Sequence, residues 1–343
     1  MKLKKWFAVV VIVIMALLTA CGGASNEGNN NEGNSDNGDT ADTTVYKLQA
    51  AHSLPADHPY ELAFLKMAEI VEERTDGRVI IETFPASQIG AEREITEGLS
   101  LGTVDLVVSS TAPVTNFVAE LGVLDLPFLF NDRDAAVKVL ESEIGDELLT
   151  ALNNQGIIGL SWGENGFRHI TNGIRPVETP DDLIGLKLRT QENAIHLAAF
   201  EALGAQPTPM AWTEALTALQ QGVVDGQENP AIVADQFNLF EAKQKYMSLT
   251  GHVYSVAIYM MSQATYDKLP KELADIVVEE GQKIGAYERD LIVEMEKESL
   301  QNLRDQGMEI IEDVDVEPFR NAISTVFDSY ENQEFLNRIL DAQ

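Results

Sequence analysis

Two groups of residues in this chain have the types and spacing of chemically active sites. Gly98, Ser100 and Gly102 match the GxSxG pattern in which a serine hydrolase presents its nucleophile. That motif requires a strand before the serine and a helix after it, whereas here a helical pattern precedes Ser100 and an apolar strand pattern follows it. The spacing therefore does not predict a hydrolase, and the sequence contains little else that indicates an enzyme.

The five histidines form the second group, because imidazole could bind a metal. His52 and His58 are close in sequence, but neither an HExxH pattern nor a carboxylate-flanked cluster accompanies them. His169, His196 and His252 are scattered along the chain. Phosphate-binding loops of the GxxxxGK[ST] and GxGxxG types are also absent from the sequence. We therefore expect no metal, no cofactor and no enzymatic activity.

The only cysteine, Cys21, stands at the end of an N-terminal targeting pattern. A basic start is followed by the apolar run 6–18, which is shorter than the ~20 residues of a membrane-spanning helix. The run ends in Leu-Thr-Ala-Cys, which resembles the bacterial lipobox, where a peptidase cleaves before the cysteine and the thiol carries a diacylglycerol. We expect residues 1–20 to be a signal peptide, Cys21 to be lipidated, and the protein to be an extracytoplasmic lipoprotein of the bacterial cell membrane.

Residues 22–44 are rich in Gly, Asn and Asp and contain no Val, Ile, Leu or aromatic residue. Such a segment cannot form a core, so residues 21–44 are expected to be a lipidated, flexible tether that reaches roughly 25 Å. The whole chain has 343 residues and a formal net charge of −31. This charge disfavours nucleic acid and anionic lipid surfaces as partners, since both are bound through Lys and Arg. The length favours two domains.

From residue 45 onward, short apolar runs alternate with amphipathic helical patterns, which is typical of an α/β sheet. The expected strands are 45–51, 79–84, 104–109, 157–162, 186–189 and 246–262. The expected helices are 59–75, 91–101, 132–152, 194–203, 213–221 and 271–306, with a short one capped by Thr179. Helix 271–306 would be about 54 Å long and is expected to run along both domains, with a bend allowed at Gly281 and Gly285.

Four segments of the chain resemble a known family. They are FPASQIGAERE at 84–94, GFRHITN at 166–172, DLIGLKLRTQ at 182–191 and ALGAQPTPMAWTEALTALQQGVVDGQENP at 202–230. They are similar to the solute-binding subunits of TRAP transporters (the DctP-like family), which bind four-carbon dicarboxylates or sialic acid. The resemblance covers nearly all of the chain from residue 45, and its most specific part is the string PTPMAW with DGQENP.

The resemblance implies a two-lobed, periplasmic-binding-protein-like α/β fold with a cleft between the lobes and a long helix along both. Lobe 1 would comprise 45–165 with about 255–294, and lobe 2 would comprise 166–254 with about 295–343. It also implies a small organic acid as ligand and a sodium-driven permease of one small and one large membrane subunit as partner. We expect a monomer. Two alternatives remain open, namely the binding lipoprotein of an ATP-driven importer and a secreted carboxylate-handling enzyme.

The resemblance also assigns ligand-binding roles. Arg189, after the GLK string, corresponds to the family's main ligand arginine, whose planar fork binds a carboxylate through two parallel hydrogen bonds. Arg168 corresponds to a second arginine, Asn229 to a polar contact, and Trp212 to an aromatic wall. The structural alternatives are a surface ion pair for Arg189, a hinge brace for Arg168, a turn residue for Asn229 and a core aromatic for Trp212.

Further candidates come from the first lobe. Glu92 and Arg93 match residues that meet polar groups of the ligand, and a glutamate there suits hydroxyls or an ammonium better than a second carboxylate. His52, at the end of the first strand, is held as a ligand contact because α/β sheets place ligands at that edge. Weaker candidates are Gln88, Ser110 and Asn165. Leu216 stands where many relatives have Tyr, so the resemblance leaves the acid open among dicarboxylates, uronates, aldonates, 2-oxo acids and sialic acid.

Overall fold

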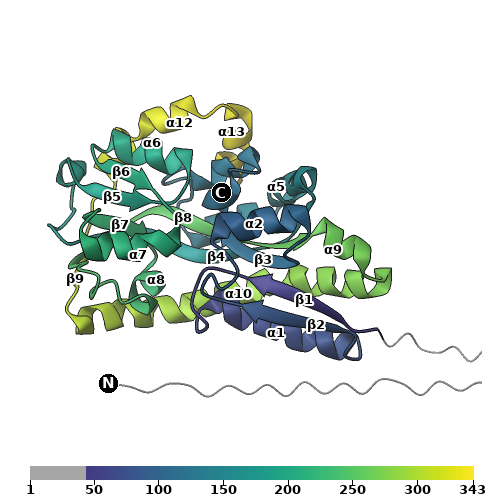
Figure 1. Cartoon of the computed structure of the whole chain (residues 1–343). Coiled ribbons are helices and arrows are strands. Elements are labelled where there is room, and N and C mark those ends of the chain that lie inside the picture. The colour runs from purple at the N-terminus through teal and green to yellow at the C-terminus, as the bar shows by residue number, and fades with distance from the viewer. Residues whose placement is uncertain (1–43) are drawn as a thin grey trace, which may run out of the picture. The chain divides into compact units, whose positions relative to one another are not determined.

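The computed structural model describes residues 44–343, which are built around one mixed β-sheet (Figure 1). Its strands lie in the order β2-β1-β3-β8-β4-β7-β5-β6, and β9 pairs with β8. They are β1 (Tyr46–Ala51), β2 (Val79–Phe84), β3 (Leu106–Ser110), β4 (Ile157–Asn172), β5 (Lys187–Thr190), β6 (Gln206–Pro209), β7 (Gly226–Asn229), β8 (Tyr246–Ser262) and β9 (Glu309–Ile311). The expected signal peptide, the lipidated Cys21 and nearly all of the tether lie outside the described residues.

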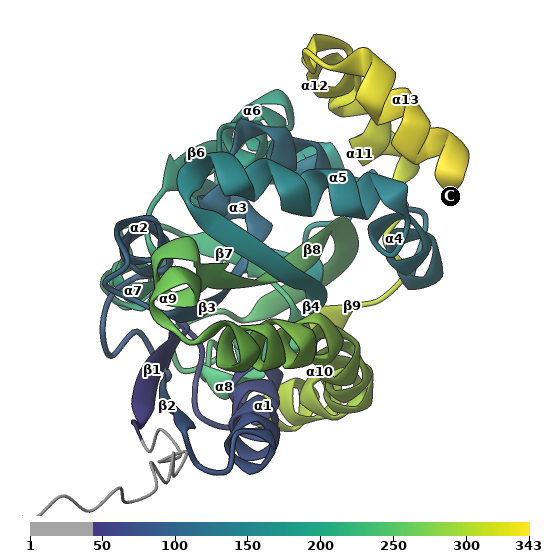
Figure 2. The ribbon, with the colours of Figure 1, turned by 90° about the vertical axis from the view of Figure 1, so that its right-hand side faces the viewer.

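Helices cover both faces of the sheet, as the two views in Figures 1 and 2 show. One buried cluster, with Phe64 and Leu219, joins α1, α7, α8 and α10 to one face. A second cluster, with Leu99 and Phe200, joins α2, α4, α5, α6, α11 and α13 to the other face. The helices are α1 (Pro59–Arg74), α2 (Glu92–Leu101), α3 (Thr111–Val114), α4 (Arg133–Leu140), α5 (Glu143–Ala151), α6 (Ala194–Ala202), α7 (Trp212–Gln221), α8 (Ala231–Gln236), α9 (Gln263–Lys268), α10 (Lys271–Gln306), α11 (Glu317–Ala322), α12 (Ser324–Ser329) and α13 (Gln333–Ala342), with 3-10 helices at Ala119–Asp125, Leu152–Gln155 and Pro180–Leu183.

Most elements predicted from the sequence are confirmed. Strands 79–84 and 246–262 and helix 271–306 have the predicted bounds, and α6 and α7 differ by one residue at an end. Thr179 precedes the 3-10 helix Pro180–Leu183, and its backbone N–H and hydroxyl donate to Oδ2 of Asp182 at 2.8 and 3.0 Å. Within residues 44–343, no helix is long and apolar enough to cross a membrane.

The prediction of a short strand at 157–162 is wrong, because β4 continues to Asn172. Its second half begins with Gly-Glu-Asn-Gly, which lacks the apolar character of a buried strand. This half is held by long-range pairing instead, since β4 lies between β8 and β7. β4 and β8 are therefore the two long strands that connect β1–β3 on one side with β5–β7 on the other.

The single helix predicted at 132–152 is also wrong, because the segment forms α4 and α5 with a break at Glu141 and Ser142. Ser142 begins α5 as its N-cap and accepts a hydrogen bond from the backbone N–H of Ile144. A Cβ at Gly145 would lie 1.8 Å from the carbonyl oxygen of Leu140. Glycine is therefore needed where α5 folds back against the end of α4.

Helix α10 packs against β4 and, on the same face of the sheet, against both α1 and α8, as predicted for a helix that runs along both parts. Its two glycines permit close packing, whereas the sequence suggested a bend. A Cβ at Gly281 would lie 2.7 Å from Leu160, and a Cβ at Gly285 would lie 2.2 Å from the carbonyl oxygen of Trp162. The helix can therefore lie directly on β4.

Candidate functional site

The strand register brings the C-terminal ends of two strands to the middle of β4. Ser110, which ends β3, is paired with Ala257 of β8, and Ala257 is paired with Gly163 of β4. Asn229, which ends β7, is paired with His169 of β4. β3 and β7 therefore point toward each other from opposite sides of β4. In open α/β sheets ligands bind at the carboxyl ends of strands, so this meeting point is the candidate site.

A small cavity lies at this meeting point, with a volume of about 20 Å³. It is lined by residues from both sides of the sheet: Ser53, Leu54, Glu92, Ser110, Asn165, Arg189, Gln191, Trp212, Asn229 and Val233. This volume holds roughly one water molecule. An organic acid can therefore enter only if the walls of the cavity move apart.

Arg189 comes from β5 and is 2% exposed. Its Nε and Nη2 donate hydrogen bonds to the carbonyl oxygen of Met210 at 3.1 and 2.8 Å, and its guanidinium lies 5.3 Å from the centre of the Trp212 ring. Burial lowers the pKa of Arg189 to about 10, so the group stays charged at neutral pH. Among residues 44–343, no carboxylate forms an ion pair with it. Arg189 therefore is a buried cation that can accept an anion.

Arg168, in β4, differs because its charge is already paired. Its Nη2 donates to Oε1 of Glu228 at 2.9 Å, and its Nε contacts Oε2 of the same carboxylate. His252 also contacts Glu228, with 3.3 Å between Nε2 and Oε2. Burial opposes ionisation of Glu228, but Arg168 and His252 hold the pKa of this carboxyl well below its usual range. Arg168 therefore braces β4 against β7 through Glu228, and its buried Nη1 has no partner within the described chain. Its role as a ligand contact stays a prediction.

Other polar atoms around the cavity also have hydrogen-bonding capacity to spare. Buried atoms without a partner in the described residues include Nε1 of Trp212, Oδ1 of Asn165 and Oε1 of Gln191. Asn229 donates from Nδ2 to Oε1 of Gln227 at 2.6 Å. Buried polar groups are normally hydrogen-bonded, so these atoms are suited to a polar ligand.

Glu92 approaches the cavity from the first turn of α2. Its Oε1 accepts hydrogen bonds from the hydroxyls of Ser109 and Ser110 at 3.1 and 3.3 Å. The carboxylate is thereby fixed at the end of β3, on the side of β4 opposite Arg189. The site therefore combines one buried cation with one facing anion.

Besides Arg168, two predicted contacts, His52 and Arg93, do not line the cavity. His52 is fully buried, and its Nε2 lies 2.9 Å from Oε2 of Glu61 in α1. This ring nitrogen is therefore already hydrogen-bonded within the protein. Arg93 is exposed on α2, and the weaker candidate Gln88 is exposed as well. Glu92, Arg189, Trp212 and Asn229 are brought together with Ser110 and Asn165, which the sequence had ranked lower.

Sequence reasoning missed Gln191, Ser53, Leu54 and Val233 in the lining of the cavity. Gln191 had a usable signal, because it follows Arg189 by two residues and side chains at i and i+2 of a strand face the same way. Its Nε2 donates to the hydroxyl of Ser110 at 2.8 Å, so it also bridges the two sides of the site. Val233, from α8, had no local signal.

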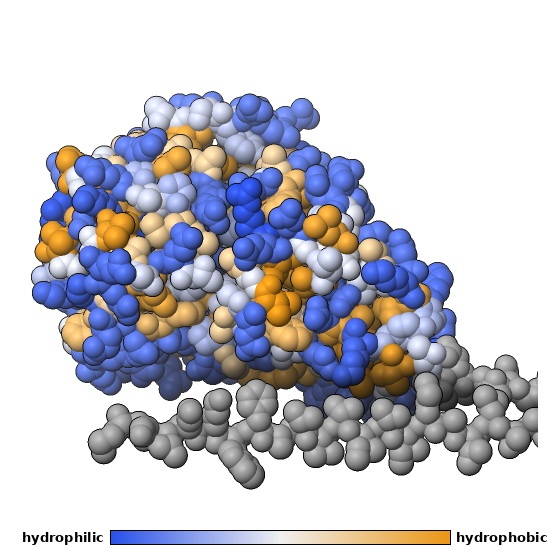
Figure 3. All heavy atoms as spheres, in the orientation of Figure 1, coloured by the Kyte–Doolittle hydropathy of each residue, from blue (hydrophilic) through white to orange (hydrophobic). Residues whose placement is uncertain are grey.

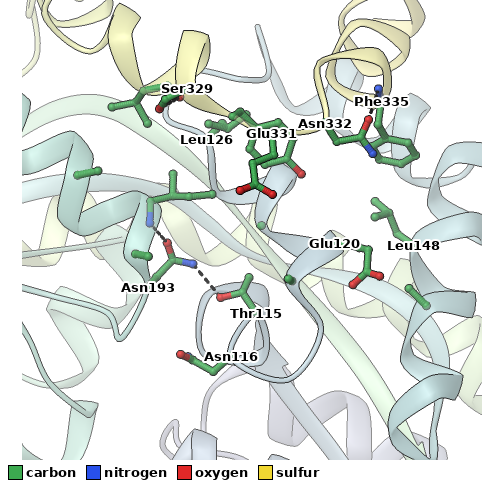
Figure 4. A pocket seen from close by; sticks show the side chains of 18 of the residues that line it. Thr115, Asn116, Glu120, Leu126, Leu148, Asn193, Ser329, Glu331, Asn332 and Phe335 are labelled. Atoms are coloured by element: carbon green, nitrogen blue, oxygen red, sulfur yellow. Dashed lines mark hydrogen bonds between the residues drawn. The ribbon is translucent and has the colours of Figure 1, made fainter.

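A larger groove, with a volume of about 870 Å³, is lined in part by residues 115–116 and 193–195 (Figure 4). It is lined by residues of the 3-10 helix Ala119–Asp125, α5, α6 and the segment 326–335. None of the predicted ligand-binding residues lines it. The groove is therefore separate from the candidate site.

Solved structures define the class of protein to which this fold belongs. A TRAP periplasmic solute-binding protein from Polaromonas sp. JS666, solved bound to D-erythronate, has 41% identity and a TM-score of 0.82, covering 86% of this chain and 97% of that one. The sugar acid binding protein of Advenella mimigardefordensis, solved with galactonate, has 31% identity and a TM-score of 0.84, covering 88% and 98%. The predicted α/β fold of the periplasmic-binding-protein type is therefore confirmed.

Sequence comparison then gives the family. The family of bacterial extracellular solute-binding proteins, family 7 (DctP), matches residues 50–333. A solute-binding protein of Verminephrobacter eiseniae is 44% identical over 266 residues, which are 78% of this chain and 79% of the relative. The chain belongs to this family of extracytoplasmic, TRAP-transporter solute-binding proteins. Its members are not enzymes, so the alternatives of a carboxylate-handling enzyme and of an ATP-driven importer subunit are set aside.

Proposed function

We propose that this protein captures a small hydroxylated monocarboxylate, such as a four-carbon aldonate, at the cavity around Arg189. The observation that carries the proposal is the buried, charged guanidinium of Arg189, which has a carbonyl oxygen but no carboxylate beside it. A buried charge without a counter-charge in direct contact is costly. A ligand carboxylate would remove this cost and could use the unpaired edge of the fork.

The other walls of the cavity favour hydroxyl groups over a second carboxylate. Glu92 would repel a second negative charge, whereas it can accept a hydrogen bond from a hydroxyl. The unpartnered oxygens of Asn165 and Gln191 are acceptors as well. Two relatives solved with D-erythronate and galactonate hold ligands of this type, each with one carboxylate and several hydroxyls. They support the choice of ligand class.

Binding would require the two sides of the sheet to separate and close again, since the cavity of about 20 Å³ is too small for an acid. We place lobe 1 at residues 45–165 with about 255–294 and lobe 2 at 166–254 with about 295–343. The β4–β8 ladder has register shifts at Gly159/Ser161, Glu164/Gly166 and Arg168/Ile170. Such irregularities weaken the ladder locally and are suited to hinges, so ligand would shift an open population to a closed one.

The closed, ligand-bound form would then be recognised by the small and large membrane subunits of a sodium-driven TRAP permease. Lipidation of Cys21 would keep the binding protein at the membrane, with residues 22–44 as the tether. Hydrophilic side chains cover most of the face in Figure 3, and hydrophobic ones occur there in small groups. We expect attachment to depend on the lipid on Cys21 and the folded part to act as a monomer.

A calorimetric ligand panel tests the proposed ligand class. D-erythronate, galactonate and succinate would be titrated into the full chain at pH 7. We expect the two hydroxylated monocarboxylates to bind at least tenfold more tightly than succinate, because only succinate places a second carboxylate against Glu92. Tighter binding of succinate would reject the monocarboxylate assignment.

A further inference from the structure

Two segments from opposite sides of the β4–β8 pair meet beside the cavity through direct hydrogen bonds. Nδ2 of Asn193 donates to Oδ2 of Asp125 at 2.9 Å and to Oγ1 of Thr115 at 3.2 Å, the latter drawn in Figure 4. Nδ2 of Asn116 donates to the carbonyl oxygen of Glu192 at 2.8 Å. Residues 111–125 follow β3, and residues 191–193 follow β5. The contact therefore joins the two sides that would have to part for a ligand to enter.

The orientation of the Asn193 amide is fixed by the helix that it begins. Its Oδ1 accepts hydrogen bonds from the backbone N–H groups of Ile195 and His196 at 2.8 and 3.0 Å, which caps α6. Because those donors require the oxygen, the amide nitrogen must face the other way. It then points across the contact to Asp125.

Asp125 is an unusual partner for such a contact, because it is a carboxyl group that is 2% exposed. It accepts a hydrogen bond from the hydroxyl of Thr111 at 2.9 Å, and no basic side chain in the described chain is hydrogen-bonded to it. Among more distant charges, Arg168 favours the ionised form and Glu228 opposes it, and the phenol of Tyr330 lies close enough to feel the charge. Burial raises the pKa of Asp125 to about 7, although the hydrogen bonds from Thr111 and Asn193 act in the opposite direction.

We propose that Asn193 and Asp125 form a latch that holds the closed form of the protein, and that the latch closes with uptake of a proton by Asp125. The proposal rests on the proposed function, in which the two sides close over a ligand. Neither residue lines the cavity around Arg189. Both are therefore positioning residues, which set the balance between open and closed forms without touching the ligand.

The direction of the pH effect follows from linkage. When the two sides separate, water reaches Asp125 and its pKa returns to the ordinary value of ~3.9. Closing then takes up a proton between about pH 4 and pH 7, so affinity for the ligand falls as pH rises through this window. With a closed-form pKa of about 7, affinity falls about tenfold between pH 6 and pH 8. Arg189 and the carboxylate of an aldonate keep their charges over this range.

The test is calorimetric titration of D-erythronate into the full chain at pH 6, 7 and 8. For the unaltered chain we expect the roughly tenfold loss of affinity. The affinity of Asp125→Asn for D-erythronate should vary by less than about twofold between pH 6 and pH 8, because no proton is taken up. Asn193→Asp keeps the helix cap but sets a second carboxylate against Asp125, so its affinity should be lowest at pH 8 and its pH dependence steeper. Asn332→Asp is the matched control, since Asn332 caps α13 and should leave the profile unchanged.

A pH profile of Asp125→Asn that matches the unaltered chain, or an unaltered chain without pH dependence, would overturn the latch. Failure of the proposed function has a different signature, namely unchanged binding by Arg189→Ala or no binding of D-erythronate at any pH. If D-erythronate does not bind at any pH, amide hydrogen exchange of the ligand-free chain, corrected for the intrinsic rate, still tests the latch. Residues 111–116 and 193–196 should be more protected at pH 6 than at pH 8, and this difference should vanish in Asp125→Asn. Its persistence in that variant would also overturn the proposal.

Discussion

At the scale of single residues, the two arginines of the site have different tasks. Arg168 is paired with Glu228 and joins β4 to β7, whereas Arg189 has no carboxylate beside it and faces the cavity. A buried ion pair that loses one member leaves the other charge unpaired, which costs about 3–5 kcal/mol. Loss of Arg168 should therefore damage the folded structure, whereas loss of Arg189 should damage binding.

Glu92 allows a prediction about selectivity. Glu92→Gln keeps the size of the side chain and its hydrogen bonds from Ser109 and Ser110, but it removes the negative charge. The affinity for succinate relative to D-erythronate should rise about tenfold or more, because juxtaposed like charges no longer oppose the second carboxylate. Parallel calorimetric titrations of both acids measure this ratio. Arg93→Gln, on the exposed side of α2, is the control.

An unchanged ratio of the affinities for succinate and D-erythronate in Glu92→Gln would mean that Glu92 does not face the ligand.

The sequence could nominate Glu92, Arg189, Trp212 and Asn229, because each lies in a recognisable sequence motif. It could not show that Glu61 is hydrogen-bonded to the ring of His52, since that contact depends on how α1 packs against β1. Nor could it show that Glu228 fills the fork of Arg168, which requires the pairing of β4 with β7.

At the scale of elements, the sequence predicted those with strong local patterns. Helix α10 and strand β8 have a long apolar rhythm, so their bounds could be predicted to the residue. The second half of β4 could not be predicted, because its polar residues become a strand only through pairing with β7 and β8. This half also carries Asn165 and Arg168. The part of the fold that was hardest to predict is therefore the part that builds the site.

The packing of α10 on β4 gives a prediction about stability. Gly285→Ala should destabilise the protein by about 1–3 kcal/mol, because the added Cβ would lie 2.2 Å from the carbonyl oxygen of Trp162. Helix propensity alone would change stability in the opposite direction, by up to ~1 kcal/mol. Urea unfolding, followed by circular dichroism, measures the difference.

The control for this packing is Gln282→Ala, at an exposed position one turn earlier in α10. It should change the free energy of unfolding by less than about 0.5 kcal/mol. Equal or greater stability of Gly285→Ala would show that α10 does not lie against β4 as described.

At the scale of the whole molecule, the proposed lipidation of Cys21 leads to a prediction about location. In cells, Cys21→Ser should either release the protein from membranes or leave the signal segment uncleaved, because no thiol is present to carry lipid. Membrane fractionation and the mass of the mature N-terminus measure both effects. Recovery of the unaltered protein with an intact Met1 or a free Cys21 thiol would reject the lipoprotein assignment.

The central claim is that Arg189 holds the carboxylate of the ligand, and calorimetry on one pair of variants tests it most directly. Removing one member of a desolvated charge pair costs ~2–5 kcal/mol, so Arg189→Ala should bind D-erythronate at least about thirtyfold more weakly than the unaltered chain. Arg338→Ala, which removes an exposed surface pair with Glu147, should bind as the unaltered chain does. An Arg189→Ala protein that is folded and binds D-erythronate with unchanged affinity would contradict the account.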